Sequence, residues 1–171
     1  GVMPLYHTMG VRSLLSMTLV NGLFAAQPKF EAGQSLDMIE SQKLTSLYLV
    51  PTLFHELLAR PSFTSQQVET CRKLGYAGAP MSDGLLKRVR EGFVPDRMVN
   101  HYGSSEIYTF TIDPDAFAKP GSAGKAGINQ RIRVVQIGAR DPEATMPVDE
   151  EGDGGAEELV DLLDGRVGVL D

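Results

Sequence analysis

Strand-like segments alternate with segments of helical spacing along most of this chain. Residues 45–51 typify the first kind, with a run of strand-forming residues closed by proline. The second kind has apolar residues at three- and four-residue intervals, as an amphipathic helix does. The expected helices are 11–22, 35–44, 52–60 and 82–93. Short strands are expected within 23–30, ending before Pro28, and at 45–51 and 131–138. Residues 71–80 are expected to begin as a strand and end in a Gly/Ala/Pro turn, and 97–106 to be a strand that runs into a polar loop. This alternation predicts an α/β fold with a mainly parallel β-sheet flanked by helices.

Capping residues mark several of the expected helix ends. Ser35 and Ser82 stand where an N-cap hydroxyl would bond the first turn of a helix. Asn21-Gly22 and Gly92 stand where helices are expected to stop.

The composition suits one globular domain or a large subdomain. The chain has 171 residues, of which 42% are hydrophobic and 22% charged. Residues 149–171 carry nine acidic side chains and one arginine, whereas the remaining residues carry 13 acidic and 15 basic side chains. We therefore expect a nearly neutral folded subdomain at 1–148, an acidic, divergent or incomplete tail at 149–171, and no nucleic-acid partner.

Other features bear on location and redox state. No apolar stretch reaches the roughly 18 residues of a membrane-spanning helix, and no signal-peptide pattern is visible, so the expected location is cytoplasmic. Cys71 is the only cysteine, which excludes an internal disulfide and favours a packed or surface thiol over a nucleophile. The chain begins in mid-pattern and without methionine, so we expect a fragment.

Three stretches with unusual polar or glycine chemistry fall at expected strand ends: 77–82, 100–106 and, less securely, 4–10. Ligands of open α/β sheets bind at the carboxyl ends of strands. The residues 77–82 belong to the sequence GYAGAPMS, whose small residues let a flat ligand approach the backbone. A tight strand-to-helix turn uses the same residues, so this alternative stays open.

His7 precedes the first expected helix. There it could line a pocket or steer a phosphate or carboxylate, and the alternative is a helix-start histidine bonded to backbone. Residues 119–127 form a glycine-rich loop that lacks phosphate-loop spacing, and a flexible surface loop is the alternative there.

The sequence NHYGSSE at residues 100–106 is more specific. Gly103 permits a turn that presents backbone N–H groups, and Ser104 and Ser105 offer hydroxyls to phosphate oxygens. Glu106 is a hard oxygen ligand suited to Mg²⁺, and Tyr102 offers a ring for a base to stack on. The alternative is a strand end followed by a serine N-cap, with Glu106 in the first turn of a helix.

These stretches together resemble the adenylate-forming enzymes, which include acyl- and aryl-CoA ligases, luciferases and peptide-synthetase adenylation domains. PLYHTMG is similar to the family's P-x-x-H segment, LGYAGAPMS to its G-G/A-A-x-hydroxyl segment, and NHYGSSE to its Y-G-x-T-E motif. PGSAGKAG is similar to its P-G-S-x-G-x-P segment. The resemblance covers roughly residues 2 to 138 and looks closest to small-acid ligases of the 4-chlorobenzoate type.

The resemblance implies a fold, a reaction and a set of residue roles. ATP and a small aromatic or alicyclic carboxylic acid would give an acyl-adenylate, and coenzyme A would then take the acyl group. Glu106 would hold Mg²⁺ and Ser105 would touch phosphate, with His7 as a further catalytic candidate. The implied nucleotide contacts are Gly78, Ala79, Pro80, Asn100, His101, Tyr102, Gly103, Ser104 and Ser105. The implied substrate-pocket residues are His7, Thr8, Met9, His101 and Gly103.

The chain departs from the family pattern. Ser105 replaces the usual threonine, and no phosphate loop, ribose-binding T-G-D motif or catalytic-lysine domain is found in the sequence. We therefore expect the isolated piece to be a poor catalyst. An adenylation domain that loads a carrier protein, and a non-catalytic remnant or binding module, remain alternatives. Apolar faces left uncovered in a fragment would favour a homodimer.

Overall fold

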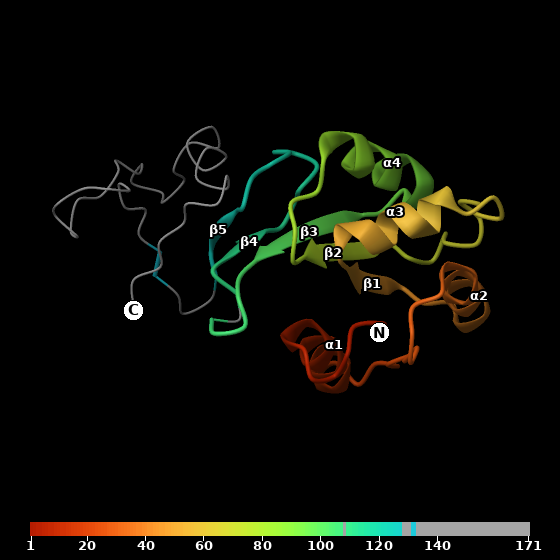
Figure 1. Ribbon diagram of the computed structural model, residues 1–171, viewed down its shortest axis with the longest axis horizontal. Helices are drawn as coiled ribbons and strands as arrows, with labels where there is room; N and C mark the ends of the chain where they lie inside the picture. Colours follow the sequence, from red (N-terminus) through yellow and green to blue (C-terminus); the bar gives the residue numbers. More distant parts are fainter. Residues whose placement is uncertain (108, 128–130, 133–171) are drawn as a thin grey trace, which may run out of the picture.

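The computed structural model describes residues 1–107, 109–127 and 131–132. In these residues four helices and five strands follow one another along the chain (Figure 1). The helices are α1 (Thr8–Leu19), α2 (Ala32–Gln42), α3 (Pro51–Ala59) and α4 (Asp83–Phe93). The strands are β1 (Ser46–Leu49), β2 (Lys73–Ala77), β3 (Arg97–Tyr102), β4 (Thr111–Asp113) and β5 (Lys125–Ala126).

The five strands form one sheet in the order β1-β2-β3-β4-β5. β1, β2 and β3 run parallel, joined by α3 and α4, whereas β4 and β5 each pair antiparallel with the preceding strand. The expected α/β class is confirmed, and the described sheet is mixed because two short antiparallel strands extend its parallel part. The expected strand at 131–138 lies outside the described residues, apart from 131 and 132, which form no strand.

The helices cover the sheet from two sides. In Figure 1 α3 and α4 lie over one face of the sheet and α1 lies against the other. α2 packs against α3 beside the β1 edge. The main core fills the α3/α4 side, where the rings of Phe54 and Phe93 meet edge to face with centroids 6.0 Å apart. Other fully buried core residues include Leu36, Ile39, Leu49, Leu57, Val68, Val89 and Met98.

The boundaries of α1 and α4 differ in part from the sequence prediction. The first helix begins at Thr8, three residues before its expected start, and ends at Leu19. Ser82 caps α4 as expected, its hydroxyl accepting from the Leu85 N–H at 3.4 Å. The expectation that Gly92 ends this helix is wrong, because Val94 takes the left-handed C-cap conformation.

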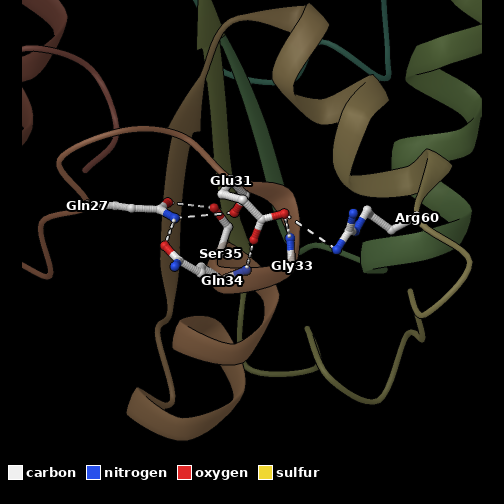
Figure 2. Close-up of polar contacts among 6 residues, drawn as sticks. All are labelled: Gln27, Glu31, Gly33, Gln34, Ser35 and Arg60. Atoms are coloured by element: carbon white, nitrogen blue, oxygen red, sulfur yellow. Dashed lines mark hydrogen bonds and ion pairs between the residues drawn. The ribbon is translucent and has the colours of Figure 1, made fainter.

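The start of α2 differs from the sequence prediction because a carboxylate caps it. Glu31 accepts hydrogen bonds from the N–H groups of Gly33, at 3.1 Å, and Gln34, at 2.6 Å (Figure 2). These bonds, that of Gln34 first, lower the pKa of the Glu31 carboxyl, which also pairs with Arg60 at 3.4 Å. Ser35 is therefore not the N-cap: it lies within α2 and is buried.

Residues 23–30 form no strand, contrary to expectation, because Gln27 fixes this segment to the start of α2. The Gln27 amide donates to the carbonyl oxygen of Glu31 at 3.2 Å and to Gln34 Oε1 at 3.3 Å. Its own oxygen accepts from the Ser35 hydroxyl at 2.7 Å (Figure 2). The segment thus serves as a connection that docks one helix, and it adds no strand to the described sheet.

Candidate functional site

The carboxyl ends of β2 and β3 lie side by side, because these strands are parallel neighbours. Ala77, the last residue of β2, is in register with His101, the penultimate residue of β3. Gly78 turns the chain out of β2 with a φ of 85°. Residues 78–80 are accessible at this edge, as are Gly103, Ser105 and Glu106 after β3. The stretches 77–82 and 100–106 therefore converge at one edge of the sheet, as the sequence predicted.

The polar loop after β3 is a closed turn. The Ser104 N–H donates to the Ile107 carbonyl at 3.1 Å, and the Ile107 N–H donates to the Ser104 hydroxyl at 3.3 Å. Residues 104–107 do not start a helix, so the N-cap alternative for this loop is wrong. The turn instead presents Ser105 and Glu106 to solvent.

Glu106 can hold a cation only with help from another molecule. A hydrogen bond from Ser104, followed by one from the Glu106 backbone, lowers the pKa of its carboxyl, which keeps it ionised. Across the described ranges, no cluster of three or more His, Cys, Asp or Glu side chains could hold a metal ion. A single carboxylate fits Mg²⁺, which takes few protein ligands and completes its shell with water and phosphate oxygens.

Asn100 and Tyr102 both have partners within the protein. The Asn100 amide donates to the Ser122 carbonyl at 2.9 Å, which ties the glycine-rich loop to β3. The Tyr102 ring lies 5.4 Å from that of Phe110, and burial raises the pKa of the Tyr102 hydroxyl. Within residues 119–127, Ser122 and Ala123 are buried, whereas 119–121 and 125–126 are exposed, so the segment is a surface loop anchored at its centre.

A row of polar side chains crosses the sheet beside Asn100. Tyr76, Asn100 and Asp113 are in register on β2, β3 and β4, so their side chains share the α4 face. Burial, and then the Asp113 charge, raises the pKa of Tyr76 to about 12. Among the described residues, Thr111 Oγ1 and Asp113 Oδ2 are the buried side-chain oxygens without a hydrogen-bond partner.

His7 is the N-cap of α1. Its Nδ1 accepts the Met9 N–H at 3.2 Å, and the side chain stays within reach of solvent. This geometry matches the alternative of a helix-start histidine bonded to backbone. Met9 is buried with 4% of its surface exposed, and Thr8 is half-buried.

A cavity of about 250 Å³ lies on the α1 face of the sheet. Of the five predicted pocket residues, His101 lines it, whereas His7, Thr8, Met9 and Gly103 do not. The structure thus brings one predicted pocket residue into this cavity and leaves four outside. The polar side chains that line the cavity are Arg12, Ser13, Ser16, Ser46, Tyr48, Lys73 and His101.

Arg12, Tyr48 and His101 form a compact group in this cavity. Arg12 Nη1 lies 2.9 Å from His101 Nδ1, and the Arg12 guanidinium carbon lies 5.6 Å from the centre of the Tyr48 ring. The Tyr48 and His101 rings meet edge to face at 5.3 Å. Tyr48 reaches His101 across Gly75, where an added Cβ would lie 2.9 Å from the Tyr48 ring. The absence of a side chain at Gly75 therefore makes this contact between β1 and β3 possible.

The electrostatics of this group favour a neutral imidazole. Burial, and then the Arg12 charge, lowers the pKa of His101 from 6.5 to about 4. Because a guanidinium only donates hydrogen bonds, the ring nitrogen that faces Arg12 is the acceptor, which places the proton of the neutral ring on Nε2. Burial also raises the pKa of the Tyr48 hydroxyl.

Sequence reasoning missed Arg12 and Tyr48. Two signals could have found them: a glycine within an expected strand marks a close approach, and Arg12 lies on the helix that follows His7. Neither signal indicates which strand face the helix covers.

The sheet and its flanking helices define an α/β protein, and comparison with known proteins places it in a family. The chain belongs to the family described as AMP-binding enzyme, whose model matches residues 1–154. It is 30% identical over 139 residues to a 4-chlorobenzoate–CoA ligase from Pseudomonas sp., covering 81% of this chain and 26% of that protein. It is 31% identical over 137 residues to an indoleacetate–CoA ligase from Aromatoleum aromaticum, covering 78% of this chain and 26% of that protein.

Solved structures agree with this assignment. ATP-bound MatB from Rhodopseudomonas palustris superposes with a TM-score of 0.70 at 26% identity, over 87% of this chain and 29% of that one. The o-succinylbenzoate coenzyme A synthetase MenE from Bacillus subtilis, in complex with ATP and magnesium ion, has a TM-score of 0.68 at 22% identity. That pair covers 81% of this chain and 29% of the other, and at this identity it supports the fold alone. The chain thus spans under a third of the length of these relatives. Within its described residues, no helix combines the length and the apolar character needed to cross a membrane.

Proposed function

We propose that this chain is part of an ATP-dependent acid–CoA ligase that activates a small aromatic or alicyclic carboxylic acid. One observation carries the proposal: the accessible segments 78–80 and 103–106 meet at the carboxyl edge of two adjacent parallel strands. Membership of the AMP-binding family and similarity to two CoA ligases of aromatic acids support it.

The proposed reaction has two steps. A carboxylate oxygen of the acid attacks the α-phosphorus of ATP, and pyrophosphate leaves with the electrons of the broken P–O bond. The thiolate of coenzyme A then attacks the carbonyl carbon of the acyl-adenylate, and AMP leaves. Holding the reactants in line and stabilising charge on phosphate are the contributions that a protein makes to such steps.

The edge residues would bind the nucleotide. Gly78, Ala79 and Pro80 offer accessible backbone for the flat face of a base, with Tyr102 beside it. The Ser105 hydroxyl and the Gly103 N–H would donate to phosphate oxygens. The Ser104 hydroxyl already donates to Glu106 and the Ser104 N–H to Ile107, so Ser104 would act by holding the turn. The contacts proposed for Asn100 and His101 are indirect in this geometry. Asn100 holds the glycine-rich loop, and His101 lies on the cavity side of β3.

Glu106 is the proposed ligand of Mg²⁺. The ion, when bound with ATP, would neutralise phosphate charge. The structural support is a carboxylate that is exposed, ionised and held in a closed turn at the same edge. His7 is proposed to face the reacting carboxylate through Nε2, because Nδ1 is engaged by the Met9 N–H. This contact would lie outside the cavity on the α1 face, which His7 does not line.

The cavity on the α1 face is the proposed acid pocket. A dry cavity of about 150 Å³ suffices for benzene. The 250 Å³ observed here therefore suits an acid with one ring and a small substituent. Thr8 and Met9 would shape this pocket only by fixing the first turn of α1, since neither lines the cavity.

Exposed apolar residues of α1 support a second, independent proposal, namely a homodimer. Leu15 is 59% exposed and Leu19 is 88% exposed, and both lie on the outer side of the helix. Burying such side chains against a second copy would be favourable. Sedimentation over a range of concentrations should show a dimer that Leu19→Glu weakens, and a strictly monomeric profile for the unaltered chain would contradict the proposal.

Binding of Mg·ATP to this chain, measured by calorimetry with and without Mg²⁺, tests the nucleotide site. Glu106→Gln should weaken Mg·ATP binding by about tenfold, or about 1.4 kcal/mol, and remove most of its dependence on Mg²⁺. The matched control is Glu40→Gln, which changes an exposed glutamate on α2 and should leave binding unchanged. Absence of Mg·ATP binding by the unaltered chain would overturn the proposed site.

The binding experiment separates one alternative, and an acyl-transfer assay separates the other. A carrier-protein-loading adenylation domain would bind the same nucleotide and acid, and it would be recognised by acyl transfer to a carrier instead of coenzyme A. A non-catalytic module would bind neither ligand.

A further inference from the structure

The cavity on the α1 face carries positive charge. Its lining includes Arg12 and Lys73, and none of the described residues that line it is an aspartate or glutamate. Most of the remaining lining is apolar. Charges in such surroundings interact more strongly than they do in water. An acid that enters this cavity therefore meets a positive field inside it.

The Arg12 guanidinium is held in a defined position. His101 Nδ1 contacts it at 2.9 Å, and the Tyr48 ring lies 5.6 Å away. His101 is neutral at physiological pH because its pKa is lowered to about 4, so it can accept a hydrogen bond from the guanidinium without repelling it. Both rings are carried by strands of the sheet, which makes the arrangement rigid. A positioned guanidinium presents its donors in a planar fork that matches a carboxylate.

The position of Arg12 relative to the carboxyl edge of the sheet decides which end of a bound acid Arg12 can contact. The activated carboxylate of the acid has to reach the loop 103–106, beyond the end of β3. The cavity lining extends from His101, near that end, back to Lys73, the first residue of β2. His101, which contacts Arg12, lies two residues before Gly103, or about 7 Å along the strand at about 3.3 Å per residue. A one-ring acid with its reacting carboxylate at the edge would therefore place its far end within the cavity.

We infer that Arg12 makes this pocket selective for an acid that carries a second anionic group, such as a carboxylate, at the end remote from the activated one. This inference rests on the proposed function and names the substrate class of the same site. Arg12 would bind the second group with charge-assisted hydrogen bonds while His101 and Tyr48 hold the guanidinium in place. A site built for such a group discriminates against acids that lack it, because its polar atoms then lose a partner.

Binding of four probes to the chain tests the inference. They are the acyl-sulfamoyl adenosines of benzoic acid, 4-methylbenzoic acid, isophthalic acid and terephthalic acid, the last two linked through one carboxylate. At least one dicarboxylic probe should bind the unaltered chain tenfold or more tightly than the benzoic probe. The 4-methylbenzoic probe controls for size and should show no such gain.

Variants separate a binding role for Arg12 from a purely structural one. Arg12→Met keeps an unbranched apolar stem and should abolish the preference for the dicarboxylic probe, while unacylated sulfamoyl adenosine binds as before. A structural role would instead weaken the benzoic and dicarboxylic probes by the same factor. Arg12→Lys should retain part of the preference. Arg88→Met, on the exposed side of α4, is the matched control and should retain all of it.

The outcomes distinguish this inference from the proposed function. Equal affinity of the unaltered chain for the benzoic and both dicarboxylic probes would overturn the role of Arg12 and leave the ligase proposal intact. Retention of the preference by Arg12→Met would likewise overturn the role of Arg12. Failure of all four probes and of Mg·ATP to bind would overturn both.

Discussion

Replacing Gly124 with alanine should destabilise the chain far more than the same replacement at Gly78. Both glycines have left-handed backbone conformations, with φ values of 86° and 85°. An added Cβ at Gly124 would lie 2.2 Å from the carbonyl carbon and oxygen of Ile112 in β4. An added Cβ at Gly78 would approach only a methyl group of Val50, at 3.3 Å. The pair therefore separates the cost of conformation from the cost of close packing.

The magnitudes follow from these contacts. Left-handed backbone costs a non-glycine residue roughly 1–2 kcal/mol, and reduced freedom of the unfolded chain returns about 0.4–1 kcal/mol. Gly78→Ala should thus lower the free energy of unfolding by about 1 kcal/mol. Gly124→Ala adds the displacement of β4 backbone, which at about 1–3 kcal/mol for overpacking brings its total to about 3 kcal/mol.

Urea unfolding followed by circular dichroism measures both changes, with the slope of the transition checked for constancy. Losses that agree within about 0.5 kcal/mol would refute the reasoning, because the close approach to β4 would then have no energetic effect. A loss of the expected size at Gly124 would also show that the glycine-rich loop is packed in solution.

Three further predictions concern titratable groups. Acidification from pH 6.5 to about 4 should destabilise the fold. The pKa of His101 is about 4 in the folded chain and 6.5 in the unfolded chain, so the unfolded chain takes up the proton first as the pH falls. Urea midpoints should fall over this range and fall less in His101→Gln; a flat profile for the unaltered chain would contradict the buried geometry. By NMR titration, Arg12→Met should raise the pKa of His101 yet leave it below 6.5, since burial is the larger cause. Cys71 is buried, and burial raises the pKa of its thiol to about 12. A thiol reagent at neutral pH should therefore modify Cys71 only as fast as the chain unfolds. Rapid modification of the folded chain would contradict this burial.

The parallel part of the fold was predictable because its signals are local. Residues 45–51 and 71–80 contain β1 and β2, and the helices between and after them follow from apolar spacing and from Ser82. Adjacent parallel strands then place their loops at one edge, so the meeting of segments 77–82 and 100–106 followed from topology alone.

The misplaced elements depended on distant partners. Residues 23–30 have a strand-like pattern, but the hydrogen bonds of Gln27 go to α2 and not to a neighbouring strand. β4 and β5 are three and two residues long, too short for a periodic pattern to identify. Ser35 suits an N-cap by type, yet Glu31 offers a carboxylate four residues earlier and caps two N–H groups.

The meeting of the two edge segments was predicted and the group of side chains in the cavity was missed, because the signals in a sequence are local. The loop 103–106 is one continuous stretch whose residue types indicate phosphate and metal chemistry. The group of Arg12, Tyr48 and His101 joins three elements separated by up to 89 positions along the chain. Sequence spacing predicts which face of a helix is apolar, but not which strand side chain that face meets.

The absence of a side chain at Gly75 affects how the shape of the cavity could change through substitution. It is the position in β2 where Tyr48 crosses over the backbone, and it lies in the cavity wall and not in the loops at the carboxyl edge. A larger residue there would push the Tyr48 ring aside and divide the cavity, while the register of β2 with β3 and the loops beyond them would stay in place. Under the proposed function, the range of accepted acids and the binding of the nucleotide would depend on different positions, so substitutions could change one without changing the other.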